Sequence, residues 1–257
     1  MDSSIRGRRV SSTRAWAKAG SGHHCFPDTR AGASDEAYAI SVYRSLIALT
    51  LLLFAAIASA AESISVVEFR SIAPATAARA PEASHALKLY AYAFSGTRWT
   101  LTEIVEAVAQ SAELLAQCRI GLDAGELRIV EAPRRFHFYS TLVSRALLRA
   151  LDVPKPAIFF VEDTHNRPAF DAEAIGLTNA RSRPELANTV WVAHGARDLP
   201  FAIAHELVHV LSDSGEHTDE PENLMREQTS PANSRLSVRQ CARVRSRGEA
   251  NGLLRPR

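Results

Sequence analysis

The residues with the clearest chemical potential form the run His205-Glu206-Leu207-Val208-His209. On a helix, side chains four positions apart lie on the same face, one turn above each other. His205 and His209 would therefore direct two imidazoles at one point, as a tetrahedral Zn²⁺ ion requires. Glu206 is one position further round the helix, where its carboxylate can reach a metal-bound water. The run predicts two zinc ligands and a general base that assists attack by this water.

A catalytic zinc ion needs a third protein ligand and an open fourth position. His217 is the strongest candidate downstream, because imidazole is a good zinc ligand, and Gly215 would let the chain turn back towards the metal. Glu216 or Asp219 is the alternative third ligand. The other acidic side chains of this segment are expected to be solvated.

The elements around these residues predict one α/β domain over residues 85–257. Asp198 is expected to be the N-cap of the helix that carries the run, with Pro200 in its first turn and Gly215 at its end. Predicted strands lie at 86–94, 126–130, 157–161, 176–179 and 189–193. Predicted helices lie at 101–118 (capped by Thr100 and closed by Gly121), 141–151, 199–212 and 237–247.

The charge distribution argues against a nucleic-acid partner. The formal net charge is +2, but residues 1–60 carry seven Lys or Arg against four Asp or Glu, so that residues 61–257 are near neutral at −1. A nucleic-acid-binding domain would be expected to show a basic surface.

An uncharged apolar segment, 46–61, is shorter than the roughly 20 residues of a membrane-spanning helix. Arg44 precedes it, and Ala58-Ser59-Ala60 has the small side chains that signal peptidase accepts. We interpret residues 42–60 as a secretory signal peptide, with an uncleaved membrane anchor as the alternative.

The segment before the signal peptide is polar and has no hydrophobic periodicity. Residues 1–41 would form a leader before the signal peptide. We hypothesise that they are not translated and that translation starts near Val42 at a non-ATG codon. Residues 61–84 are rich in Ala, Pro, Ser and Glu, and are interpreted as a linker or short pro-segment.

Cysteine usage is consistent with export to an oxidising compartment. Cys25 lies in the leader, which leaves Cys118 and Cys241 in the mature part. An even number suggests one disulfide, although two separate buried thiols are the alternative.

The site residues resemble the metzincin clan of zinc peptidases, in a matrixin-like form. The resemblance rests on His205, Glu206, His209 and His217, and on Met225, which follows the ligand segment. It implies a zincin fold with a twisted, mostly parallel sheet, an active-site helix and a C-terminal helix. It also implies a methionine in a tight turn beneath the zinc, and Met225 is the only methionine besides Met1.

The ligand spacing departs from the family pattern. In that pattern the third histidine falls six residues after the second, with a glycine at the third position. Here His217 comes eight residues after His209, and Ser212 occupies the glycine position. This variant spacing, HExxH-x7-H, makes Gly215 the expected turning residue.

The same layout would place Cys118 at the end of the first helix and Cys241 in the last helix, which favours a disulfide between them. Of the other histidines, His85, His137, His165 and His194 have no ligand-like spacing and are expected to be structural.

Together these features predict an exported zinc endopeptidase, periplasmic or extracellular, with one catalytic Zn²⁺. Its partner would be a polypeptide substrate, held along an edge strand within residues 174–193. No nucleic acid is expected, nor any stable membrane association once the signal peptide is cleaved. The alternatives are a zinc hydrolase of another secreted amide and a non-catalytic, zinc-stabilised binding protein.

Overall fold

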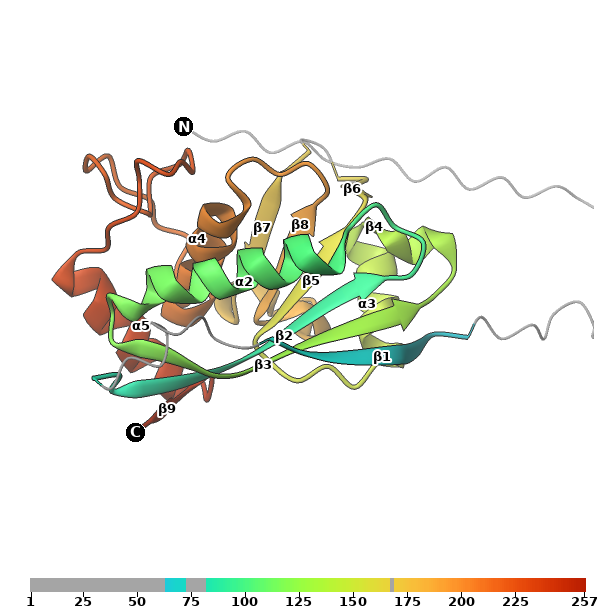
Figure 1. Ribbon diagram of the computed structural model, residues 1–257, viewed down its shortest axis with the longest axis horizontal. Coiled ribbons are helices and arrows are strands. Elements are labelled where there is room, and N and C mark those ends of the chain that lie inside the picture. Colours follow the sequence, from blue (N-terminus) through green and yellow to red (C-terminus); the bar gives the residue numbers. More distant parts are fainter. Residues whose placement is uncertain (1–62, 73–81, 167–168) are drawn as a thin grey trace, which may run out of the picture. The chain divides into compact units, whose positions relative to one another are not determined.

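A seven-stranded sheet runs through the computed structural model, which describes residues 63–72, 82–166 and 169–257 (Figure 1). In chain order the elements are β1 (Ser65–Ile72), β2 (His85–Phe94), α2 (Leu101–Ala116), β3 (Ile120–Glu131), β4 (Phe138–Tyr139), α3 (Thr141–Ala150), β5 (Ala157–Val161), β6 (Asp163–Thr164), β7 (Ala172–Ile175), β8 (Thr189–Ala193), α4 (Leu199–Ser212), α5 (Val238–Ala250) and β9 (Leu254–Pro256). Short 3₁₀ helices span Arg134–His137, Thr178–Ala180 and Pro184–Leu186.

The central strands of the sheet are parallel and the outer ones are antiparallel. The order is β1-β3-β2-β5-β8-β7, with β9 paired to β2 and with β4 and β6 forming a separate small sheet. The pairs β3/β2, β2/β5 and β5/β8 are parallel, whereas β1, β7 and β9 run antiparallel to their neighbours. Parallel neighbours need crossover connections, and α2 supplies one between β2 and β3. The prediction of an α/β fold with a mostly parallel sheet is confirmed.

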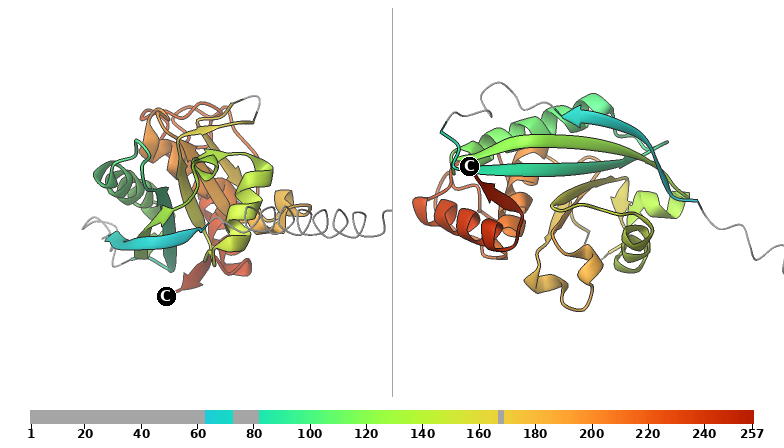
Figure 2. Two further views of the ribbon diagram at one scale, coloured as in Figure 1. Left: turned by 90° about the vertical axis from the view of Figure 1, so that its right-hand side faces the viewer. Right: turned by 90° about the horizontal axis from the view of Figure 1, so that it is seen from below.

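Helices cover both faces of the sheet, with α2 and α3 on opposite sides (Figure 2). The buried side chains of α2, α4 and α5 belong to one apolar cluster, and those of α3 belong to a second. Strand β5 contributes to both: Ile158 and Phe160 face the first cluster, and Phe159 and Val161 face the second. A strand buried on both faces has a continuous apolar sequence, which is why β5 reads Ala-Ile-Phe-Phe-Val.

Three stacked rings fix the register of the central strands. Tyr92 of β2, Phe159 of β5 and Trp191 of β8 lie opposite one another, with ring centroids 4.8 and 4.3 Å apart along the row. The indole N–H of Trp191 donates to the Thr189 hydroxyl at 2.9 Å. This row anchors β8, the strand from which the chain enters α4.

The helices that carry strong local signals agree with the sequence predictions. Thr100 caps α2, because its side chain accepts a hydrogen bond from the Glu103 N–H. The predicted helices 141–151 and 199–212 correspond to α3 and α4, and 237–247 corresponds to α5, which extends to Ala250. Strands 157–161 and 189–193 have the predicted bounds.

Other predictions were wrong. The strand expected at 176–179 lies instead at Ala172–Ile175, and a 3₁₀ turn follows it at Thr178–Ala180. Gly121 does not close the first helix: it lies in β3, and Arg119 takes the left-handed conformation with φ 59°.

Long-range pairing produces strands that the sequence analysis missed. Strand β1 falls within the segment interpreted as a linker or short pro-segment, and β9 lies beyond the last predicted helix. Each forms by hydrogen bonding to a remote strand, β3 and β2 respectively.

The predicted leader (1–41) and signal peptide (42–60) lie outside the described residues. In the ranges that are described, no helix has the length and apolar character needed to cross a membrane.

A disulfide joins Cys118, just after α2, to Cys241 in α5, as predicted. The two cysteines are 123 positions apart, and their Cα atoms lie 4.8 Å apart. The bridge therefore links the first helix of the domain to the last.

Replacing both cysteines by alanine should lower the free energy of unfolding by about 3–5 kcal/mol, because the open chain gains loop entropy when it unfolds. Urea unfolding of the chelator-treated protein without reductant would measure the difference. The wild type in reducing buffer is the matched control, and it should approach the double variant. Equal unfolding midpoints for the oxidised wild type and the double variant would contradict the expectation.

Candidate metal centre

Helix α4 is buried on nearly all sides, which fixes the direction of every side chain it carries. From Ala202 to Ser212 each residue is buried except Glu206, which is half-buried. Its apolar residues pack against the sheet, α2 and α5 as part of the first cluster. Asp198 occupies the predicted N-cap position, but its φ is 50° and its side chain makes no capping hydrogen bond.

The structure brings three of the predicted site residues together. His205 and His209 lie one turn apart on α4, and His217 reaches them from the segment that follows. The Nε2 atom of His205 lies 2.9 Å from that of His209 and 3.1 Å from that of His217, and the third separation is also 3.1 Å. Among the described residues this is the one group of three or more His, Cys, Asp or Glu side chains able to hold a metal ion.

Backbone carbonyls hold the two helical imidazoles from behind. The Nδ1 atom of His205 lies 2.7 Å from the Leu224 carbonyl oxygen, and that of His209 lies 2.6 Å from the Ser214 carbonyl oxygen. Because a carbonyl oxygen only accepts, each Nδ1 must carry the proton and donate it. In the neutral rings this leaves the lone pair on Nε2, the atom that faces the cluster.

Burial keeps these rings neutral. It lowers the pKa of His205, and it lowers the pKa of His209 to about 4. Neutral nitrogen lone pairs 2.9 Å apart repel each other unless a cation or proton lies between them. The donor set therefore fits a metal ion that accepts nitrogen ligands.

Neither alternative candidate for the third ligand, Glu216 or Asp219, belongs to the histidine cluster. The Glu216 carboxylate forms an ion pair with Arg243 of α5, and Asp219 is exposed and does not belong to the cluster. His217 itself is exposed, unlike the two helical histidines.

The chain turns towards His217 at Asp213 rather than at Gly215. Asp213 ends α4 in the left-handed conformation with φ 48°, whereas Gly215 has no positive φ. The Asp213 carboxylate accepts hydrogen bonds from the backbone N–H (2.9 Å) and the hydroxyl of Thr178. A Cβ atom on Gly176 would lie 3.0 Å from Asp213 Oδ1, so glycine allows this close approach.

Glu206 lies at the meeting point of two cavities. The first cavity has a volume of about 240 Å³ and is lined by Glu173, Gly176 and Asn179. The second has a volume of about 720 Å³ and is lined by Arg197 and Glu227. Glu206 and His217 line both cavities. Burial raises the pKa of Glu206 to about 8, against the effect of a hydrogen bond from the Ala174 backbone. A carboxyl group with this pKa can accept or donate a proton near neutral pH.

Met225 lies beside the segment that carries His217. It is buried at 3% exposure, and its carbonyl oxygen accepts a hydrogen bond from the N–H of Thr218, next to His217. The residue before it, Leu224, supplies the carbonyl that holds His205.

The other histidines that the structure describes make contacts outside the cluster. His85 bonds Ser84 and Glu249, and the His137 ring contacts the Ala132 carbonyl. The rings of His165 and His194 pack against Phe138 and Trp99 respectively.

No protein-family model matches the sequence, and no curated protein matches it. Among solved structures, the chain is similar to metalloproteinase-II from Bacteroides fragilis, with 17% identity and a TM-score of 0.42. The match covers 64% of this chain, which spans 53% of the length of that structure.

The Asp213 turn can be tested by separating backbone conformation from side-chain bonding. Asp213→Ala should destabilise the protein more than Asp213→Gly does. Both variants lose the Thr178 bonds, but alanine keeps a Cβ atom in the left-handed conformation, at a cost of about 1–2 kcal/mol that glycine avoids. Thermal unfolding of both variants measures this. Gly215→Ala is the matched control and should have little effect, since its φ is not positive and nothing lies within 4 Å of an added Cβ. Equal melting temperatures for Asp213→Ala and Asp213→Gly would contradict the assignment.

The lowered pKa of His209 predicts a pH dependence of stability in metal-free protein. As pH falls from 6.5 towards 4, His209 takes up a proton in the unfolded chain before it does so in the folded protein. The free energy of unfolding should therefore fall over this range. Urea unfolding of chelator-treated protein at several pH values measures the slope. The raised pKa of Glu206 acts in the opposite direction, so the comparison is with His209→Gln, whose stability should fall less steeply. Identical slopes would contradict the prediction.

Proposed function

We propose that this chain is an exported, zinc-dependent endopeptidase. The observation that carries the proposal is the convergence of three imidazole Nε2 atoms beside Glu206, in a cleft bordered by the edge strand β7. The chemistry of the donors, the placement of the base and the shape of the cleft each support it.

The donor set favours zinc. Three neutral imidazoles are a known ligand set of catalytic zinc, and ligands about 2.0–2.1 Å from a tetrahedral ion lie about 3.3 Å apart. The Nε2 separations of 2.9–3.1 Å are close to that spacing. When bound, zinc polarises a carbonyl group and lowers the pKa of a coordinated water.

Glu206 is proposed as the general base. Its side chain follows His205 on the helix and faces the cleft, so it can accept a proton from the attacking water and pass it to the leaving amine. The Ala174 backbone holds its carboxyl group, which ties the base to β7.

Strand β7 is proposed to bind the substrate. Among the described strands it pairs only with β8, on one side, and Ala172 and Ala174 line the cleft beside Glu206. An extended peptide can add to such an edge by backbone hydrogen bonds. Glu206 lines two cavities, which leave room for more than one substrate residue around the cleaved bond and favour internal cleavage.

We further propose that the centre is metzincin-like and closest to the matrixin form, with His205, His209 and His217 as ligands and Met225 in the turn beneath the metal. The buried position of Met225 beside the His217 segment supports this assignment. The Cys118–Cys241 disulfide supports export to the periplasm or the extracellular medium, with residues 42–60 as the signal peptide.

Metal analysis and cleavage of an unstructured protein by Glu206→Gln and the wild type test the proposal. The wild type should hold one zinc per chain, and Glu206→Gln should keep the zinc but lose about 10²–10⁴-fold in kcat, as expected for removal of a general base. Glu113→Gln, on the exposed face of α2, is the matched control and should behave as wild type.

Three outcomes would overturn the proposal. Zinc-free wild type would exclude the metal centre. Equimolar zinc without cleavage of any peptide would favour a zinc-stabilised binding protein, and cleavage restricted to non-peptide amides would favour a different hydrolase.

A further inference from the structure

Two side-chain amides, those of Asn223 and Gln240, connect the segment before Met225 to helix α5. Asn223 is buried, at 4% exposure. Its Nδ2 donates to Gln240 Oε1 at 3.0 Å, and its Oδ1 accepts from Gln240 Nε2 at 3.1 Å. Asn223 Nδ2 also donates to Glu220 Oε2, and Oδ1 also accepts from the Met225 N–H. Two donations and two acceptances use the full capacity of this amide.

Asn223 fixes the backbone that holds the first metal-site histidine. Leu224 lies between Asn223 and Met225, and its carbonyl oxygen accepts from His205 Nδ1 at 2.7 Å. The Leu224 N–H donates to the Arg235 carbonyl at 2.7 Å. Bonds to Leu224 itself and to both its neighbours therefore set the direction of the carbonyl that orients the His205 ring.

Gln240 is itself fixed by the start of α5. It forms a capping box with Ser237: the Ser237 N–H donates to Gln240 Oε1 at 2.7 Å, and Ser237 Oγ accepts from the Gln240 N–H at 3.3 Å. The side chain that pairs with Asn223 is thus held by the first helical turn, not by the metal centre.

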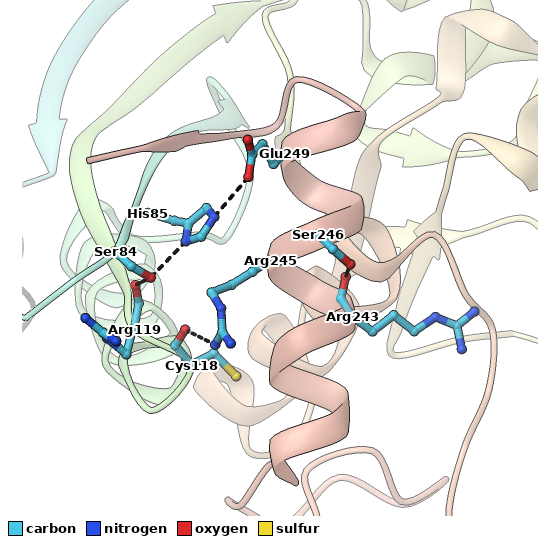
Figure 3. Close-up of polar contacts among 8 residues, drawn as sticks. All are labelled: Ser84, His85, Cys118, Arg119, Arg243, Arg245, Ser246 and Glu249. Carbon is cyan, nitrogen blue, oxygen red and sulfur yellow. Dashed lines mark hydrogen bonds and ion pairs between the residues drawn. The ribbon is translucent and has the colours of Figure 1, made fainter.

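Helix α5 is anchored to distant parts of the domain. The Arg245 guanidinium donates to the Cys118 carbonyl at 2.9 Å, and Glu249 contacts the His85 ring at 3.3 Å (Figure 3). The disulfide from Cys241 to Cys118 adds a covalent link one residue after Gln240. A rigid support for Asn223 therefore exists whether or not the three histidines hold a ligand.

We propose that Asn223 and Gln240 are positioning residues of the metal centre: their paired amides hold the Leu224 carbonyl against His205 and keep its Nε2 aimed at the ion. This inference rests on the zinc binding proposed above. Loss of outer partners of a metal-bound histidine weakens metal affinity by about 10–100-fold. Because this pair acts through a backbone carbonyl, we expect about 10-fold, the lower end of that range.

The test is a double-mutant cycle read as zinc affinity in the full chain with its disulfide intact. Asn223→Ala, Gln240→Ala and the double variant are titrated with zinc against a competing chelator, and their Co²⁺ absorption spectra are recorded. Each single change should weaken zinc binding and alter the Co²⁺ bands. The double variant should be no weaker than Asn223→Ala, because both changes remove the same pair. Asn233→Ala is the matched control, since it removes a hydrogen bond to the Gln228 carbonyl in the same segment.

Gln240→Glu carries the test if an alanine variant does not fold. It keeps the oxygen that accepts from Ser237 but removes the donation to Asn223. Single variants with wild-type zinc affinity and Co²⁺ spectra, whatever their melting temperatures, would overturn the proposal, as would strictly additive effects. Wild type that binds no zinc overturns the proposed function and this inference together. Zinc-binding wild type that cleaves nothing affects the proposed function alone.

Discussion

The Nε2 atoms of His205 and His209 face each other at 2.9 Å inside the protein, and most of the surrounding structure serves to hold them there. Lone pairs at this distance repel, so each ring would rotate away if only its Cβ were fixed. The Leu224 and Ser214 carbonyls prevent this by accepting from Nδ1. Both carbonyls lie in non-helical segments after α4, so the site depends on how those segments are anchored.

The three clustered histidines differ in the rigidity of their support. Helix α4 packs within the first apolar cluster, and the stacked rings of β2, β5 and β8 fix the strand that leads into it. His217 is exposed on a connecting segment, held by the Thr218 bond to Met225 and the ion pair of Glu216 with Arg243. Burial lowers the pKa of His205 and His209, so both rings of the buried pair are neutral near pH 7, the form in which an imidazole can bind a metal ion.

The features that the sequence predicted correctly depend on residues close together in the chain. Helix α4 and its two histidines follow from a five-residue run, and the Thr100 cap follows from neighbouring residues. Strands β1 and β9 were missed because their pairing partners are remote. Strand β7, which pairs with the next strand along the chain, was placed too late in the sequence. The choice among His217, Glu216 and Asp219 was open because composition does not separate them; Arg243, on a helix over 20 residues away, engages Glu216. Backbone carbonyls such as that of Leu224 have no sequence signature at all.

The long spacing between His209 and His217 follows from where the helix ends. In the pattern that this sequence resembles, a glycine at the position of Ser212 makes the turn, but here Ser212 is still helical and the left-handed residue is Asp213. Of the two residues by which this spacing exceeds the family pattern, one extends helix α4 and the other lies in the segment between Asp213 and His217. Asp is less favourable than Gly at positive φ by about 1 kcal/mol, yet its carboxylate accepts two hydrogen bonds from Thr178. A glycine could make the turn but could not tie the segment that carries His217 to the segment that follows β7. Aspartate at this position therefore joins the two walls of the cleft.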